Sequence, residues 1–234
     1  VPAEGLASYA GGFSIRRAEG VPFELTDVVF ALIPHRPGRR LDCLLVFAAD
    51  PSLGPEAYRL TVAERRVDIA SSTRRGAYYA LSTLRQLADP RTGTIPCVSI
   101  EDAPDLPLRG FMMDVSRDKI PAMDTVMRFV DAMAFVKMNH FELYVEGFPF
   151  AYPSFPEVWQ DETPFTPEEY EELDAYCAAR EIDFVPNLNG FGHMSAWLAR
   201  PEFRKLAECE EGYVAWGYPF PPSTLNPLDP DSFE

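Results

Sequence analysis

The chain has 234 residues, 47% of them hydrophobic, and a formal net charge of −15, so it is long enough for one large domain or two ordinary ones. An acidic surface repels phosphate backbones and anionic lipid headgroups, which excludes nucleic acids and membrane surfaces as expected partners and favours a neutral or cationic ligand. No apolar run approaches the roughly 20 residues of a membrane span, and no signal peptide is visible at the N-terminus.

The charge is distributed unevenly along the chain. Residues 1–105 contain 12 Lys and Arg against 13 Asp and Glu, whereas residues 106–234 contain 9 against 23. A polar stretch that contains proline, Glu101 to Asp105, separates the two parts. We therefore predict two domains, residues 1–105 and residues 106–234.

Four cysteines are widely spaced and form no C-x-x-C pair, namely Cys43, Cys97, Cys177 and Cys209. This spacing argues against a zinc knuckle or a thioredoxin-type site and favours reduced, buried thiols. Reduced thiols favour a cytoplasmic protein. Because the chain starts with Val rather than Met, we expect that it has been trimmed, and a secreted form is the alternative.

The first part has the pattern of a small α+β domain, an antiparallel sheet with one helix. Short strands are expected at residues 13–16, 28–33 and 41–48. A hairpin follows, because alternating apolar residues run from Tyr58 to Val62 and return from Val67 to Ile69. Residues 73–87 change to helical spacing, and residues 95–100 form a further strand.

The second part alternates strands with helices. An apolar run from Leu108 to Arg117 predicts a buried strand with a charged end, and further strands are expected at residues 141–145 and 184–188. Helices are expected at residues 123–138, after the capping sequence at Thr166, and at residues 194–207. Such units predict parallel strands in either an open sheet or a barrel. No G-x-G-x-x-G or phosphate-loop sequence follows these strands, so a nucleotide-binding open sheet is disfavoured and the barrel is favoured.

In parallel β/α folds, ligands bind at the carboxyl ends of the strands. The side chains expected there are Asp114, Arg117, Glu142, Tyr144, Glu146, Asn187, Asn189 and His193. Arg117 suits sugar hydroxyls or a carboxylate, with a salt bridge to Asp114 or Asp118 as the alternative. His193 follows a glycine turn and opens a helix, and a capping or core histidine is the alternative. His35 and His140 are expected to be structural.

The loop of residues 147–165 is rich in aromatic residues and proline, which suits either a wall that stacks on sugar rings or, as we favour, a small satellite core. Glu142 and Glu146 fall on one face of a strand, but their spacing does not identify an acid and base pair. No spacing of histidines and carboxylates indicates a metal site, and we expect no cofactor.

Three segments together resemble the start of the catalytic barrel of glycoside hydrolase family 20, the β-N-acetylhexosaminidases. They are Arg109-Gly-Phe-Met-Met-Asp-Val-Ser-Arg117, Val130-Asp-Ala-Met-Ala-Phe-Val-Lys-Met-Asn139 and Val185-Pro-Asn-Leu-Asn-Gly-Phe-Gly-His-Met194. Residues 57–62, 76–87 and 95–104 resemble the small domain that precedes this barrel. The resemblance implies an α+β domain followed by an incomplete TIM barrel.

The resemblance also implies a function. In this family the acetamido oxygen of the substrate attacks the anomeric carbon, a glutamic acid protonates the leaving oxygen, and an aspartate holds the acetamido nitrogen. Arg117 falls on the arginine that binds sugar hydroxyls, His193 on a histidine that supports the acid, and Trp197 near a family tryptophan. Asn189 is expected to bind substrate, and the expected partner is a carbohydrate that contains N-acetylhexosamine.

Two positions depart from the family pattern. Where His-x-His and an Asp-Asp pair are usual, this chain has Glu142-Leu-Tyr144-Val-Glu146-Gly147, which leaves Glu146 as a candidate replacement carboxylate with a catalytic role. The turn before His193 reads Asn189-Gly-Phe-Gly rather than Asp-x-Pro-Gly. These changes indicate a divergent branch of the family.

The family's Asp-Glu catalytic pair would lie beyond residue 234, so we expect this chain to be a fragment that is inactive alone. Because an incomplete barrel has open sheet edges and an uncovered apolar face, we expect the chain to self-associate or to have a loosened second half. The alternatives are a carbohydrate-binding module without catalysis on the same scaffold and a TIM-barrel sugar enzyme of another family.

Overall fold

The computed structural model describes residues 2–9, 12–21, 43–117 and 119–233. The chain forms two compact units, one of Val1–Arg109 with Met133–Met138 and one of Gly110–Ala132 with Asn139–Glu234. The division predicted between residues 105 and 106 stays a prediction.

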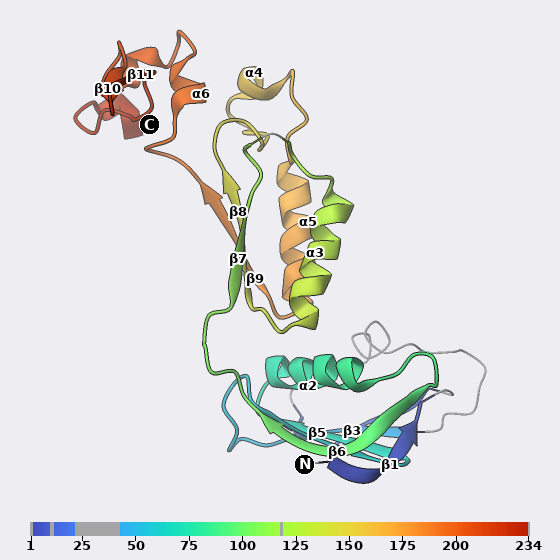
Figure 1. The fold of residues 1–234 in the computed structure, drawn as a ribbon. Coiled ribbons are helices and arrows are strands. Elements are labelled where there is room, and N and C mark those ends of the chain that lie inside the picture. Colours follow the sequence, from blue (N-terminus) through green and yellow to red (C-terminus); the bar gives the residue numbers. More distant parts are fainter. Residues whose placement is uncertain (1, 10–11, 22–42, 118, 234) are drawn as a thin grey trace. The chain divides into compact units, whose positions relative to one another are not determined.

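The first unit contains a six-stranded sheet and one helix (Figure 1). Its elements are β1 (Pro2–Ser8), β2 (Phe13–Arg17), β3 (Cys43–Ala49), β4 (Tyr58–Ala63), β5 (Arg66–Ser71), α2 (Arg74–Leu87) and β6 (Thr94–Asp102). The strand order is β1-β6-β4-β5-β3-β2. The hairpin, the helix and the strand after it were predicted; β1 was not, and the strand predicted at residues 28–33 lies outside the described residues.

This sheet is mixed rather than antiparallel, which corrects the prediction. Strand β3 pairs in parallel with both β2 and β5, while β4 runs antiparallel to β5 and β6. The sequence of β3 is a continuous apolar run, CLLVFAA, and such runs are typical of strands with parallel neighbours, because both of their faces are buried.

Helix α2 covers one face of this sheet and supplies much of the core of the first unit. The side chains of Ala77, Leu81 and Leu84 are fully buried at helical spacing. The helix begins at an N-cap, Thr73, whose side chain accepts a hydrogen bond from the backbone N of Gly76 at 3.1 Å. The stripe predicted from the sequence is therefore the face that packs on the sheet.

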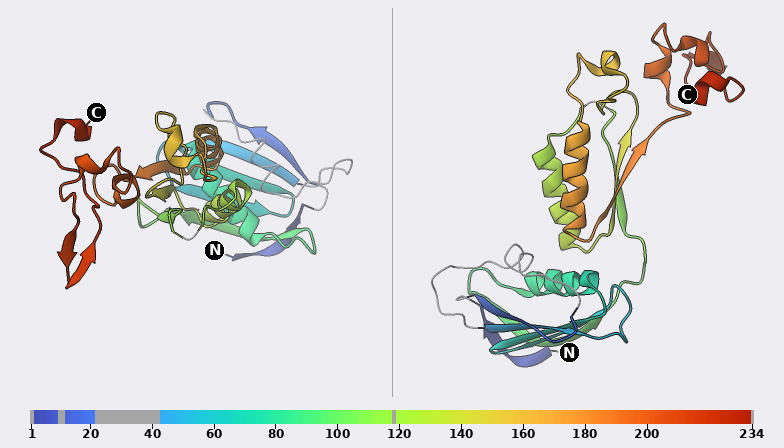
Figure 2. Two further views of the ribbon diagram at one scale, coloured as in Figure 1. Left: turned by 90° about the horizontal axis from the view of Figure 1, so that it is seen from above. Right: turned by 180° about the vertical axis from the view of Figure 1, so that it is seen from behind.

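The second unit contains three parallel strands in the order β7-β8-β9. Its main elements are β7 (Gly110–Asp114), α3 (Met123–Phe135), β8 (His140–Val145), α4 (Pro156–Trp159), α5 (Pro167–Ala178) and β9 (Asp183–Leu188). Both views of the ribbon place α3 and α5 on the same face of this sheet (Figures 1 and 2). This is the start of a (β/α) barrel, as predicted.

Strand β8 shows how this sheet presents two different faces. Phe141, Leu143 and Val145 are fully buried, and Phe141 contacts Phe129 of α3 with ring centroids 6.0 Å apart. Glu142 and Tyr144, at the alternate positions, point to the opposite face and are only partly buried. The face that the helices leave uncovered thus carries the polar side chains of β8.

Two predicted helices end earlier than expected. Helix α3 stops at Phe135 because Lys137 adopts φ +61°, and the backbone N of Met138 donates to Met133 O at 3.0 Å, which closes a Schellman turn. The helix predicted at residues 194–207 is replaced by α6 (Ser195–Leu198) and the 3₁₀ helix η1 (Arg204–Leu206). Pro201 lies between them and interrupts the helical hydrogen bonds.

The remaining residues form a short hairpin and a final turn. Strands β10 (Tyr213–Ala215) and β11 (Tyr218–Phe220) pair antiparallel, and a 3₁₀ helix η2 (Pro230–Phe233) follows. The hairpin was not predicted.

Candidate functional site

The segments that follow β7, β8 and β9 bring three of the predicted site residues together. Arg117 Nη2 lies 2.8 Å from Glu146 Oε2, and His193 Nδ1 lies 3.3 Å from the same carboxylate oxygen. Each residue comes from the carboxyl end of a different strand or from the turn after it. Glu146 therefore links a fixed cation to a titratable imidazole.

Arg117 also forms a salt bridge with Asp114, the interaction that the sequence offered as its alternative role. The backbone N of Ser116 and the guanidinium of Arg117 both donate to Asp114. Burial alone would raise the pKa of Asp114, but these hydrogen bonds and the charge of Arg117 outweigh it and hold the pKa below its ordinary value. Arg117 thus pairs with two carboxylates, while its side chain stays 54% exposed and faces solvent.

Ser116 and Tyr144 complete this cluster. The hydroxyl of Ser116 donates to Tyr144 O at 3.2 Å and accepts a hydrogen bond from the backbone N of Glu146, so it ties the end of β7 to the end of β8. The Tyr144 hydroxyl donates to Glu146 Oε2 at 3.4 Å, and the Arg117 guanidinium lies 5.7 Å from the centre of the Tyr144 ring. Sequence reasoning missed Ser116, since a lone serine at a strand end carries no distinctive signal.

Glu142 has a separate set of partners. His140 Nε2 lies 2.7 Å from Glu142 Oε1, and Asn187 Nδ2 donates to Glu142 Oε2 at 3.0 Å. The hydrogen bonds from His140 and Asn187 lower the pKa of Glu142. In a strand, Cα atoms four residues apart lie about 13 Å from each other. The paired carboxyl groups of glycosidases are about 5–9.5 Å apart, which is a shorter separation. Glu142 and Glu146 therefore share a face without forming an acid and base pair.

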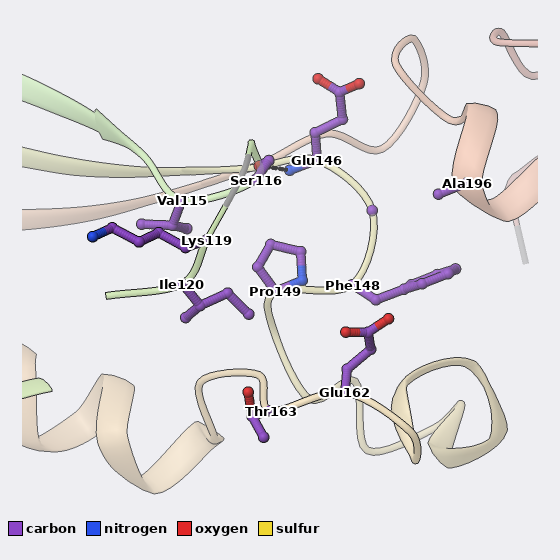
Figure 3. Close-up of a pocket in the computed structure, with 11 residues that line it drawn as sticks. Val115, Ser116, Lys119, Ile120, Glu146, Phe148, Pro149, Glu162, Thr163 and Ala196 are labelled. Carbon is purple, nitrogen blue, oxygen red and sulfur yellow. Dashed lines mark hydrogen bonds between the residues drawn. The ribbon is translucent and has the colours of Figure 1, made fainter. Parts of the chain in front are cut away.

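A pocket of about 520 Å³ opens beside this cluster at the ends of β7 and β8 (Figure 3). Its walls come from the segment after β7, from the segment after β8, from the segment before α5 and from Ala196; the first of these contributes Val115, Ser116, Lys119 and Ile120. Figure 3 shows the carboxylate of Glu162 directed toward Phe148 and Pro149, while the carboxylate of Glu146 is directed away from them. Glu146 thus belongs both to the pocket wall and to the cluster around Arg117.

His193 and Asn189 lie in the turn after β9. His193 adopts φ +57°, an uncommon conformation for a residue with a side chain, and its side chain is 59% exposed. It precedes α6 by two residues, so it is neither a helix cap nor a core histidine. The Asn189 side chain donates to Val145 O at 3.1 Å and holds the turn against β8. The role of Asn189 in substrate binding stays a prediction.

Trp197 lies in a buried aromatic cluster and is 8% exposed. Its ring contacts four others with centroids 5.0–5.4 Å apart, those of Phe148, Tyr152, Phe155 and Phe203. The loop after β8 thus forms the satellite core favoured in the sequence analysis. Sugar binding by Trp197 stays a prediction, and the pocket wall includes its neighbours Ala196 and Phe148.

Other classes of site are not apparent in the described residues. Residues 2–9, 12–21, 43–117 and 119–233 include no group of three or more His, Cys, Asp and Glu side chains that could hold a metal ion. Nor does this part of the chain contain a helix long and apolar enough to cross a membrane. Cys43, Cys97 and Cys177 are buried, whereas Cys209 is exposed, contrary to the expectation of burial.

Parallel β/α units with a cation, carboxylates and an imidazole at the strand ends place the chain among barrel proteins that bind polar ligands at this edge. Residues 17–103 match the model of glycosyl hydrolase family 20, domain 2, and residues 106–234 match that of the family's catalytic domain. The chain belongs to glycosyl hydrolase family 20.

Relatives and solved structures agree with this assignment. A β-hexosaminidase of Akkermansia muciniphila is 41% identical over 174 residues, which cover 65% of this chain and 35% of that protein. A β-hexosaminidase of Vibrio vulnificus is 29% identical, with 90% of this chain and 29% of that protein covered. The chain therefore spans about a third of the length of these relatives.

The fold agrees with that of a family 20 β-N-acetylhexosaminidase from Streptomyces coelicolor, with a TM-score of 0.78 and 26% identity over 99% of this chain and 53% of that one. An exo-β-N-acetylglucosaminidase from Vibrio harveyi, solved with N-acetylglucosamine, also gives a TM-score of 0.78 at 22% identity and is similar in fold. The alignment of the two structures covers all of this chain and 41% of the Vibrio chain.

Proposed function

We propose that the protein containing this chain is an exo-glycosidase that removes terminal N-acetylhexosamine, and that the cluster of Arg117, Glu146 and His193 forms part of its sugar-binding site. Membership of family 20 and the names of the relatives support the reaction. The location of the sugar-binding site is supported by one observation, the shared contact of Arg117 and His193 with Glu146.

In this proposal Arg117 binds hydroxyl groups of the terminal sugar. Its guanidinium offers several N–H donors in one plane, which matches two neighbouring hydroxyls. Asp114 and Glu146 accept from two of its nitrogens and fix the orientation of that plane. The carboxylates also raise the pKa of Arg117, so it stays charged in every relevant buffer.

Glu146 and His193 have supporting roles in the same proposal. The imidazole of His193 is exposed and is held by Glu146. It can therefore transfer a proton to a group that enters the site or form a hydrogen bond with it. Glu146 stands where the family has acidic residues, and we assign it a role in positioning both Arg117 and His193. Family resemblance attributes bond cleavage to a substrate-assisted mechanism with a separate Asp-Glu pair.

We further propose that the partner is a neutral glycan, and that neither nucleic acid nor an anionic membrane is bound, given the net charge of −15. Self-association of the 234-residue chain is expected through the sheet face opposite α3 and α5. That face exposes Met112 at 52% and Val185 at 36%. Sedimentation that shows a compact monomer at all concentrations would contradict self-association. A cytoplasmic location, suggested by the wide spacing of the cysteines, is tested by fractionating the native cells.

The reaction is tested with an aryl N-acetyl-β-glucosaminide. The protein that contains this chain is expected to hydrolyse it, and Arg117→Ala is expected to lower kcat/KM by about 10- to 100-fold, the loss of one or two hydrogen bonds to a charged group. The 234-residue chain alone is expected to show no appreciable turnover. If the whole protein binds N-acetylglucosamine without hydrolysing the aryl glycoside, the exo-glycosidase proposal fails in favour of a binding module.

A further inference from the structure

The hairpin of β10 and β11 presents an aromatic face to solvent. Tyr213 pairs with Phe220, and Ala215 pairs with Tyr218, so these four side chains lie on one face of the hairpin. The rings of Tyr213 and Phe220 stack with centroids 5.5 Å apart. Tyr218 is 70% exposed and Tyr213 is 42% exposed.

Trp216 extends this face from the tip of the hairpin. It is 88% exposed, and its ring contacts Phe220 edge-on with centroids 6.0 Å apart. Trp216 and Gly217 adopt φ +52° and +81°, the backbone of a type I′ turn, whose favoured first residue is Asn rather than a bulky side chain. A large ring is therefore held in an unfavourable conformation at the tip, although it packs into no core.

A pocket with hydrogen-bonding groups opens beside the aromatic face. It has a volume of about 450 Å³ and is lined by Glu208, Cys209, Tyr213, Ser223 and Thr224. The hydroxyls of Tyr213 and Ser223 lie 3.2 Å apart at its wall. Exposed rings next to hydroxyl and carboxylate groups are what a pyranose requires, because a sugar ring has apolar faces and a polar edge.

Charge narrows the class of ligand. The sequence from Glu208 to Asp229 has carboxylates at those two positions and at Glu210 and Glu211, with no Lys or Arg between them. A sulfated or sialylated glycan would be repelled, whereas a neutral glycan would not.

We propose that the aromatic face formed by Tyr213, Trp216, Tyr218 and Phe220, with the adjoining pocket, is a second carbohydrate-binding site that stacks on the rings of a neutral oligosaccharide. The site uses none of the residues that hold Arg117, Glu146 and His193. It therefore goes beyond the function proposed above and does not depend on cleavage.

The test uses the protein that contains this chain and measures by calorimetry how tightly it binds two probes. One is N-acetylglucosamine and the other is a thio-linked tetramer of N-acetylglucosamine, whose sulfur bridges resist cleavage. Trp216→Asn is expected to weaken binding of the tetramer by about 5- to 10-fold, and Tyr218→Ala by a similar factor, while binding of the monomer stays unchanged. Asn suits the type I′ turn, so the first variant is expected to unfold at the same temperature as the parent or a higher one.

Val214→Ala is the matched control. Val214 is 74% exposed and pairs with Pro219, so it lies on the other face of the same hairpin. This variant is expected to bind both probes like the parent. Equal tetramer affinity in the parent and in Trp216→Asn would overturn the proposal, and so would a tetramer that does not bind. Self-association that Trp216→Asn abolishes, with no change in sugar binding, would identify a second copy of the chain as the partner instead.

Discussion

Arg117 and Glu146 form an ion pair between the segment after β7 and the end of β8, with Nη2 and Oε2 2.8 Å apart. The two side chains are 54% and 27% exposed, so solvent screens their attraction and the pair adds little to the stability of the fold. Its main effect is to fix the plane of the guanidinium at the carboxyl ends of the strands. A structural role and a binding role can thus be separated by experiment.

Arg117→Lys is expected to change the free energy of unfolding by less than about 1 kcal/mol, as for other exposed ion pairs. The same variant is expected to weaken N-acetylglucosamine binding by about 10-fold, since lysine keeps the charge but loses the planar set of donors. Urea unfolding and calorimetry measure the two quantities. Arg128→Lys, the same substitution in an exposed ion pair with Asp124 on α3, serves as the control. Unchanged affinity in Arg117→Lys would show that this residue does not bind the sugar.

His193 permits a second separation, because its ring and its backbone can be changed independently. At φ +57° a glycine is unstrained, so His193→Gly is expected to keep or slightly increase the melting temperature. Loss of the imidazole is expected to lower sugar affinity or kcat/KM by about 10-fold or more. His193→Val, which is branched and disfavoured at this φ, should instead lower the melting temperature. Full activity in the glycine variant would remove His193 from the site.

The sequence predicted most of the second unit, because the patterns there are local. The apolar alternation of β8 and the capping sequence at Thr166 both act within a few residues, and both appear in the structure. The convergence of Arg117 and His193 followed from a general property of parallel strands, whose carboxyl ends meet at one edge. Glu146 was predicted at the same edge, but periodicity could not supply its shared contact with Arg117 and His193. Nor could it supply the hydroxyl of Ser116 that ties the two strand ends.

The errors have physical causes that a pattern of single residues does not reveal. The parallel pairing of β3 with β2 and β5 depends on contacts between distant strands. The β10 and β11 hairpin was missed because its turn is Trp216-Gly217 rather than the usual Asn-Gly. Resemblance assigned Trp197 to the substrate, which stays a prediction, but it could not reveal that the ring lies among four others.

Trp197 gives a third prediction. Trp197→Ala is expected to destabilise the protein by about 3–5 kcal/mol, because it leaves a cavity among Phe148, Tyr152, Phe155 and Phe203. Trp197→Phe should retain much of that packing and lose less. Chemical unfolding measures both, with sugar binding measured alongside. If Trp197→Phe weakens sugar binding while unfolding normally, the ring contacts the ligand as well as the core.

Glu142 predicts a dependence of stability on pH. Hydrogen bonds from His140 and Asn187 lower the pKa of Glu142 below its ordinary value of 4.5, so the ionised form stabilises the folded state. That contribution is fully present above pH 4.5 and is lost as the pH falls through the lowered pKa. Glu142→Gln is therefore expected to be less stable than the parent at pH 7 and to differ from it less and less as the pH falls toward 3. Melting temperatures between pH 3 and 7 test this, and a constant difference would contradict it.

The start of helix α5 offers the most local prediction. The Thr166 side chain accepts a hydrogen bond from the backbone N of Glu169 at 3.2 Å, and the Glu169 carboxylate accepts one from the backbone N of Thr166 at 2.9 Å. Pro167 occupies the first helical position, where no backbone donor is required. Because these two bonds satisfy free N–H groups, Thr166→Ala is expected to cost about 1 kcal/mol of unfolding free energy and Thr166→Ser much less. Glu171→Ala, an exposed change further along α5 that leaves both capping bonds in place, is the control. Equal effects of Thr166→Ala and Glu171→Ala would contradict a special role of the capping bonds in stabilising α5.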